Sequence, residues 1–201
     1  MKEILKFFEH ILNSVDNGDD HSVPNVNPTE IFNEGWMTRL LVYQSIKEKL
    51  IIDGLIDFVK IKNWSSEGLI SSPFVKAKKN REGYTHADMT LGDFAIDYKG
   101  RGEITVSDSA INFGIIEAKM GSNLSQGTTH APDYNQASRN LACIAENVKN
   151  ETCKTFFTVV APITMIKHHK IMEQTEKGFM IKQIKHRFEL SDMAIDNDLI
   201  E

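Results

Sequence analysis

Residues 112–119, NFGIIEAK, are the stretch around which the chain is expected to fold. The apolar run that ends in Ile115 and Ile116 predicts a buried central strand. Side chains two apart in a strand share a face, so Glu117 and Lys119 point the same way and Ala118 points into the opposite layer. A glutamate and a lysine at the end of a buried strand must be solvated, paired or bound to something. This strand end is therefore a candidate site.

Other strands are predicted on both sides of this stretch. Residues Tyr84–Leu91 and Phe94–Tyr98 have strand character, and Gly92-Asp93 between them fits the tight turn of a hairpin. Residues Thr155–Ala161 form a continuous β-branched and aromatic run, which predicts a buried strand covered on both faces.

Helices are predicted between and around the strands. Asn27 as N-cap with Pro28 at the first helical position predicts a helix that runs to about residue 50, and Pro132 opens another that runs to about Lys149. The apolar face of the first helix is expected to contain Phe32, Trp36, Met37, Leu40, Leu41 and Ile46. Residues 64–74, WSSEGLISSPF, are interpreted as a short helix that ends at Pro73. One or two further helices are expected up to about residue 189.

This order of elements predicts an α/β sandwich with a mixed central sheet. A length of 201 residues suits one domain, with N-terminal helices over 1–52, a core over 53–161 and C-terminal helices over 162–201. No apolar run approaches the roughly 18 residues that span a bilayer, and the N-terminus, MKEILKFFEHILNSV, is patterned as an amphipathic helix, not a signal peptide. Cys143 and Cys153 have no metal-binding spacing, so reduced thiols in a cytoplasmic protein are expected.

Asp88 lies on the strand predicted before the central one. If the two strands are neighbours, two carboxylates and an ammonium group converge. Paired carboxylates suit Mg²⁺, a hard cation that prefers oxygen ligands. Such a metal activates water and neutralises phosphate charge, while Lys119 can position or deprotonate that water or stabilise the developing charge.

These residues resemble the PD-(D/E)xK nuclease superfamily, the restriction-endonuclease-like fold. Asp88 matches its first acidic position and Glu117-Ala118-Lys119 its (D/E)xK element. The resemblance, which covers roughly residues 29–161, implies a three-layer sandwich whose mixed sheet is flanked by helices. It also implies that Glu34 supports the metal with Asp88 and Glu117, and that Gln136 completes the site. The string EAKMGSNLSQGTTHAPDYNQASRNLACIAE is similar to a group of bacterial proteins of this fold.

The chain departs from the superfamily pattern in two places. Ala87 stands where the superfamily has proline, and the long gap between Asp88 and Glu117 requires an inserted hairpin. A second D-x-K, Asp97-Tyr98-Lys99, ranks below Glu117 because it abuts a glycine-rich turn and lacks the buried apolar run.

The expected function is hydrolysis of phosphodiester bonds of DNA or RNA with Mg²⁺ or Mn²⁺, with nucleic acid as partner and a homodimer as one arrangement that cuts both strands. The net charge of −5 and the pI near 5.8 count against a generic basic nucleic-acid binder. They do not exclude a local basic patch, for which the run Lys76–Arg81 is a candidate. The alternative is a non-catalytic interaction or nucleic-acid-binding module of the same fold within a larger defence or DNA-processing assembly. Gln136 and Asn140 share a helix face, and the simplest alternative for them is a hydrogen bond to a loop.

Overall fold

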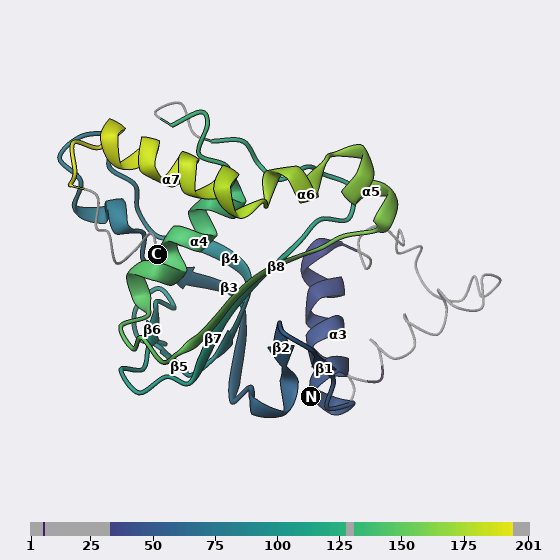
Figure 1. The fold of residues 1–201 in the computed structure, drawn as a ribbon. Coiled ribbons are helices and arrows are strands. Elements are labelled where there is room, and N and C mark those ends of the chain that lie inside the picture. The colour runs from purple at the N-terminus through teal and green to yellow at the C-terminus, as the bar shows by residue number, and fades with distance from the viewer. Residues whose placement is uncertain (1–5, 7–32, 128–130, 195–201) are drawn as a thin grey trace.

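A mixed four-stranded sheet forms the centre of the molecule (Figure 1). The computed structural model describes residues 6, 33–127 and 131–194. The sheet has the order β3-β4-β7-β8, and its first three strands are antiparallel while β8 runs parallel to β7. The bounds are β3 Asn63–Ile70, β4 Thr85–Gly92, β7 Asn112–Ala118 and β8 Lys154–Val160. The prediction of an α/β fold with a mixed central sheet is confirmed.

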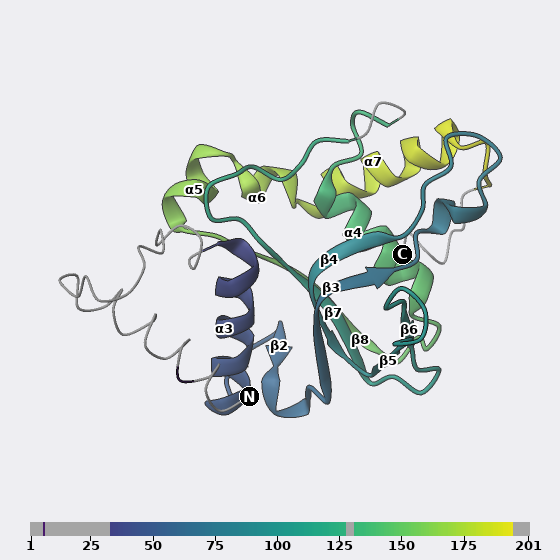
Figure 2. The same ribbon diagram turned by 180° about the vertical axis from the view of Figure 1, so that it is seen from behind.

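Helices cover both faces of this sheet, as the two opposite views show (Figures 1 and 2). Helix α3, Glu34–Lys47, packs on one face through a cluster that includes Val42, Met89 and Ile116. Helix α4, Gln136–Asn147, packs on the other face, where Cys143 and Ile144 meet Ile115. The remaining elements are β1 Ile51–Ile52, β2 Ile56–Asp57, η1 Phe58–Lys60, η2 Pro73–Lys76, β5 Phe94–Ile96, β6 Ile104–Val106, α5 Ile163–His168, α6 Ile171–Gln174 and α7 Lys177–Leu190.

Strand β7 is the buried central strand that its sequence predicted. Every residue from Phe113 to Ala118 is buried. Its side chains alternate between the layers, since Phe113 and Ile115 join the cluster beneath α4 while Ile116 joins the cluster beneath α3. Gly114 leaves room for the Phe156 ring of the neighbouring strand β8, because a Cβ at position 114 would lie 2.4 Å from that ring. The alternation places Glu117 on the α4 side.

One strand-pairing prediction and one helix prediction are wrong. Strand β4 does not pair with β5, since β4 lies between β3 and β7 while β5 pairs with β6. Gly92, with φ +128°, lies against the carbonyl of Asn112 and carries the chain out of the sheet. Residues 63–70 form strand β3 and not a helix, and Pro73 begins the short helix η2. Residues 63–70 adopt a strand because they pair with the open edge of β4, and burial within a sheet overrides a weak helical pattern.

The helix before the sheet begins at Glu34, where the Asn33 side chain accepts a hydrogen bond of 3.0 Å from the Trp36 amide. The start predicted at Asn27 and Pro28 lies outside the described residues, as does Phe32. The predicted apolar face is wrong in part, because Trp36, Leu40 and Leu41 are 44%, 46% and 40% exposed, while Ile46 packs against the cluster that contains Val42. The helix buries Thr38, Val42 and Ser45 instead. Small side chains let it lie close to the sheet.

The C-terminal part of the fold also differs in detail from its pattern. Strand β8 is an edge strand in which only Phe156 is buried, so the cover predicted on both of its faces is incomplete. The helix expected from Pro132 begins later, at Gln136, with Asn135 as its N-cap. Three helices, α5, α6 and α7, follow β8 where one or two were expected. Among the described residues, no helix combines the length and apolar character needed to cross a bilayer.

Candidate active site

The pairing of β4 with β7 stops one residue short of Asp88. The last pair in register is Met89 with Ile116. The next amide on the same side of β7, that of Ala118, donates a 2.8 Å hydrogen bond to the Asp88 carboxylate. A side chain thus replaces the backbone acceptor of the ladder, and the two strands separate. The separation opens the end of the sheet where β7 terminates, and it places Asp88 beside Glu117 as the sequence predicted.

Glu117 is fully buried and held by three donors. Its Oε1 accepts hydrogen bonds from the Lys119 ammonium group at 2.7 Å and from the Gln136 amide. Its Oε2 accepts one from the Asn140 amide at 3.0 Å. Lys119 is itself only 6% exposed. The predicted shared face of Glu117 and Lys119 is confirmed, and Gln136 does reach the strand.

Asn140 is the residue that the sequence reasoning undervalued. Gln136 and Asn140 lie one helical turn apart on α4, so both side chains face β7 and each holds one oxygen of Glu117. The signal was available in the i, i+4 spacing, but the partner was expected in a loop. Gln136 meets that expectation as well, since its carbonyl oxygen accepts from the amide and the hydroxyl of Ser125, both at 3.2 Å.

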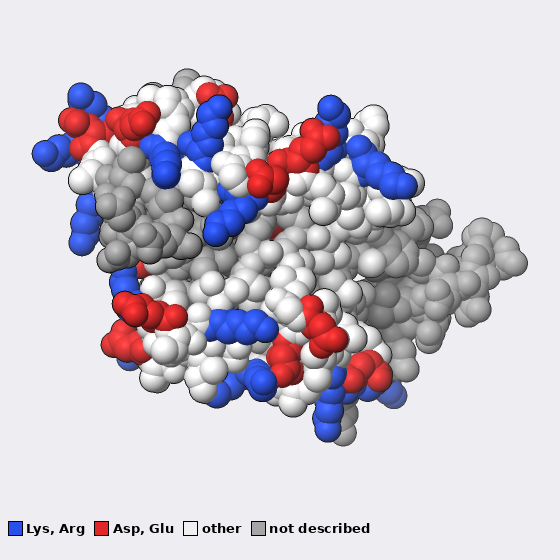
Figure 3. Space-filling model, in the orientation of Figure 1, with Lys and Arg blue, Asp and Glu red and all other residues white. Residues whose placement is uncertain are grey.

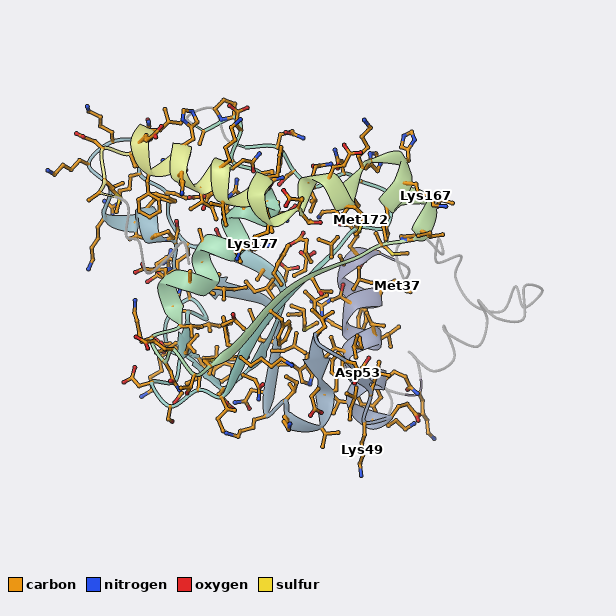
Figure 4. The ribbon with its side chains drawn as sticks, viewed as in Figure 1. Met37, Lys49, Asp53, Lys167, Met172 and Lys177 are labelled. Atoms are coloured by element: carbon orange, nitrogen blue, oxygen red, sulfur yellow. The ribbon has the colours of Figure 1, made fainter. Side chains whose placement is uncertain are left out.

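Glu34 reaches the site from the first turn of α3. One of its oxygens accepts from the Met120 amide at 2.9 Å and from the Ser122 hydroxyl at 3.0 Å, and the other lies 3.9 Å from the Lys119 nitrogen. Glu34 therefore fixes the turn that follows β7 and adds negative charge beside Lys119. Figure 4 shows the direction of α3, with Met37 towards its upper end and Lys49 beyond its lower end.

The charges at this site do not balance. Burial, and then the charge of Asp88, raise the pKa of Glu117 to about 8, although Lys119 acts in the opposite direction. Burial lowers the pKa of Lys119, but Glu117, Asp88 and Glu34 outweigh it, so that pKa is raised above its usual value. Three acidic side chains thus surround one cation. At neutral pH a proton on Glu117 relieves their repulsion, and a second cation could take the place of that proton.

The metal-binding roles assigned to Asp88, Glu117 and Glu34 stay a prediction. Across residues 33–127 and 131–194, no three His, Cys, Asp or Glu side chains are grouped so that they could hold a metal by themselves. The oxygens available at one place are those of Asp88 and Glu117. Mg²⁺ keeps several waters and is often held by one or two carboxylates, so this donor set fits Mg²⁺ or Mn²⁺.

The second D-x-K has a structural explanation. Asp97 lies in the turn of the β5–β6 hairpin, where its Oδ1 accepts from the amides of Lys99 and Gly100 at 2.9 and 3.2 Å. Asp97, Tyr98 and Lys99 are all exposed, and Tyr98 is 86% exposed. The hairpin is the insertion that the gap between Asp88 and Glu117 required.

The remaining candidates lie apart from this cluster. Both cysteines are free, and burial raises the pKa of the Cys143 thiol to about 12, which makes it unreactive. In the run of residues 76–81, Lys76, Lys78, Lys79 and Arg81 are exposed, and Lys79 lies 3.6 Å from Asp192.

Comparison of this chain with protein-family models, with curated proteins and with solved structures gives no match in any of the three. The function is therefore argued from the geometry of the site.

Proposed function

We propose that this chain is a nuclease of the restriction-endonuclease-like kind, which hydrolyses phosphodiester bonds of DNA or RNA with Mg²⁺ or Mn²⁺. The observation that carries the proposal is the meeting of Asp88 and Glu117 where β4 separates from β7, with the Lys119 ammonium group 2.7 Å from Glu117. Two carboxylates and a lysine at one strand end are the groups that the resemblance to the PD-(D/E)xK superfamily requires.

The arrangement of the elements supports the same proposal. A mixed sheet lies between helices on both faces, as in the three-layer sandwich that the resemblance implies. Glu34 is on the helix that precedes the sheet, and Gln136 is on the helix that follows the strand of Glu117. Both side chains reach the end of β7, which is where the resemblance assigns their roles.

Each residue of the cluster has a distinct task in this proposal. Asp88 and Glu117 hold the metal, which when bound neutralises phosphate charge and lowers the pKa of its water. Gln136 and Asn140 orient the Glu117 carboxylate from α4. Glu34 fixes the Met120 turn and, with Glu117, holds Lys119 in place.

From the sequence, Lys119 could position the water, deprotonate it or stabilise the developing charge, and the charges around it count against deprotonation. Its pKa is raised by the surrounding carboxylates, so the ammonium form persists at neutral pH. A protonated lysine donates hydrogen bonds and stabilises the negative charge that develops on the phosphate, whereas a base would have to be neutral.

The test is cleavage of DNA and RNA in Mg²⁺ or Mn²⁺ by the wild-type chain and by Lys119→Ala. Loss of one charge-stabilising donor costs about 10²–10³ in rate, so cleavage should fall by that factor. Asp97→Ala is the matched control, because it removes the acid of the exposed D-x-K and should cleave normally. Unchanged cleavage by Lys119→Ala would refute the assignment.

One observation favours the alternative, a non-catalytic module of the same fold. Both oxygens of Glu117 already accept from side chains, which leaves fewer lone pairs for a metal. Calorimetry separates the two functions. A nuclease should bind Mn²⁺ at millimolar concentration or better and lose this binding in Asp88→Asn, whereas the module would bind none.

A further inference from the structure

Arg39 is a half-buried arginine on α3 whose guanidinium group is held in place by Ser66 and Trp36. Its Nε donates a 2.9 Å hydrogen bond to the Ser66 hydroxyl on β3, and its guanidinium carbon lies 5.6 Å from the centre of the Trp36 ring. The side chain folds back along the helix, since a Cβ on Gly35 would lie 3.0 Å from its Nη1. The planar group is therefore oriented before any ligand arrives.

Arg39 differs in its partners from Arg101, Arg139 and Arg187, whereas Arg81, which also has no carboxylate within 4 Å among the described residues, is exposed. Arg101 and Arg139 each have a glutamate 2.9 Å from Nε, and Arg187 has one at 3.9 Å. Among the described residues, no carboxylate lies within 4 Å of Arg39, and its two terminal nitrogens donate to no described acceptor. A partly buried cation without a counter-ion favours an anion, and the guanidinium fork matches a phosphate.

Arg39 lies on the α3 face of the sheet, beside the position on β3 and β4 that is next to Asp88. Ser66, which holds it, is the cross-strand partner of Met89, the residue after Asp88. Glu34, on the same helix, contacts Met120 after β7. The first turns of α3 thus extend across the open end of the sheet from β7 to β3. Two strand spacings are about 10 Å, close to the axial rise of about three nucleotides.

The charge distribution makes a single oriented cation important. On the face shown in Figure 3, basic and acidic side chains are interspersed, and neither sign covers a continuous area. The whole chain carries a net charge of −5. On this face, binding of a polyanion would have to depend on individual placed cations more than on a broad basic surface.

We infer that Arg39, oriented by Ser66, binds a backbone phosphate of a polynucleotide next to the phosphodiester at the Asp88–Glu117 site. The inference rests on the proposed function for the identity of the ligand, and it defines the substrate as a chain of several nucleotides. A diester with only one phosphate cannot use Arg39.

The experiment measures binding of a labelled oligonucleotide, single-stranded and duplex, to the full chain in EDTA, where metal-dependent cleavage cannot occur. Arg39→Ala should bind the oligonucleotide at least about tenfold more weakly, as expected for loss of a charge-assisted hydrogen bond. Arg39→Lys should recover only part of the lost affinity. Ser66→Ala should show a smaller loss. Arg101→Ala, which removes the same charge from the distant hairpin, should bind within about twofold of wild type.

Kinetics supply the second readout. In Mg²⁺, Arg39→Ala should raise KM for the oligonucleotide much more than it lowers hydrolysis of bis(p-nitrophenyl) phosphate, because that diester has a single phosphate. Thermal melting of each variant checks the fold. Equal loss of binding in Arg39→Ala and Arg101→Ala, wild-type binding by Arg39→Ala, or no binding of any oligonucleotide by the wild type would each overturn the inference.

The two proposals fail separately. If the wild type cleaves nothing but Arg39→Ala still loses binding selectively, the nuclease assignment falls and the phosphate site stands. If the wild type cleaves and Arg39→Ala binds normally, only the phosphate site falls.

Discussion

Two glutamates of this protein are surrounded by opposite excesses of charge. Glu82 has two cations for one carboxylate, with Arg139 at 2.9 Å and Arg187 at 3.9 Å, and it also accepts from the Ser72 hydroxyl at 3.2 Å. Glu117 shares its single cation, Lys119, with two further carboxylates, Asp88 and Glu34.

The difference separates a structural cluster from a candidate reactive one. The Glu82 cluster joins the segment before β4 to α4 and α7. The positive charges of Arg139 and Arg187 more than neutralise the carboxylate of Glu82, so the cluster requires no further cation. In the Glu117 cluster the described residues supply one cation for three acidic side chains, and burial, followed by the charge of Asp88, raises the pKa of Glu117. Such an imbalance is typical of functional sites.

The largest expected effect is that of Asp88→Asn. The asparagine oxygen can still accept from the Ala118 amide, but a metal ligand and a repulsive charge are lost. Cleavage should fall by about 10³-fold, while the melting temperature in EDTA stays the same or rises. Cleavage assays and thermal melts check this. If Asp88→Asn were less stable than wild type and still cleaved, the Glu117 cluster would be structural and not reactive.

Glu82→Gln should show the opposite pattern. It leaves Arg139 and Arg187 without their carboxylate in a partly buried place, so the free energy of unfolding should fall by about 3 kcal/mol. Oligonucleotide binding by the folded fraction should remain. Urea unfolding measures the loss, and stability equal to wild type would show that the Glu82 cluster does not hold the segment.

The raised pKa of Glu117 predicts a pH dependence of stability without metal. Its carboxyl binds a proton more tightly folded than unfolded, so this contribution is fully present below the usual pKa of 4.5 and is lost as pH rises through about 8. Between pH 6.5 and 8, wild type should lose roughly 2 kcal/mol relative to Glu117→Gln, at about 1.4 kcal/mol per pKa unit. Urea unfolding in EDTA at both pH values measures it, and a constant difference would contradict the shift.

The smallest effect is expected for Asn140→Ala. Asn140 touches only Glu117 among the groups of the site, so it positions that carboxylate and does not contact the phosphate. Cleavage should fall about tenfold, or about 1.4 kcal/mol, with a changed metal affinity as the second readout. A loss as large as that of Asp88→Asn would mean that Asn140 has a more direct role.

The local patterns near β7 predicted this region well. The alternation of Glu117, Ala118 and Lys119 and the spacing of Gln136 on its helix are local properties, and both were predictable from the order of residues. The strand β3 was missed because residues 63–70 have no strong pattern of their own and become a strand by pairing with β4. The exposed face of α3 was mispredicted because the helix packs on the sheet through Val42 and two small polar residues, Thr38 and Ser45, and not through its larger apolar side chains.

The sequence alone determined the α/β class, the central strand, and the residue types of the cluster, because period, burial and side-chain chemistry are encoded over short distances. Only the tertiary structure decided that Asp88 meets Glu117, that Asn140 holds the second oxygen of Glu117, and that Arg39 is fixed by Ser66 without a carboxylate. These pairs lie 23–29 residues apart. Their meeting depends on strand register and helix packing, which come from the whole fold. The i, i+4 spacing of Gln136 and Asn140 indicated a shared helix face but not the group that this face contacts.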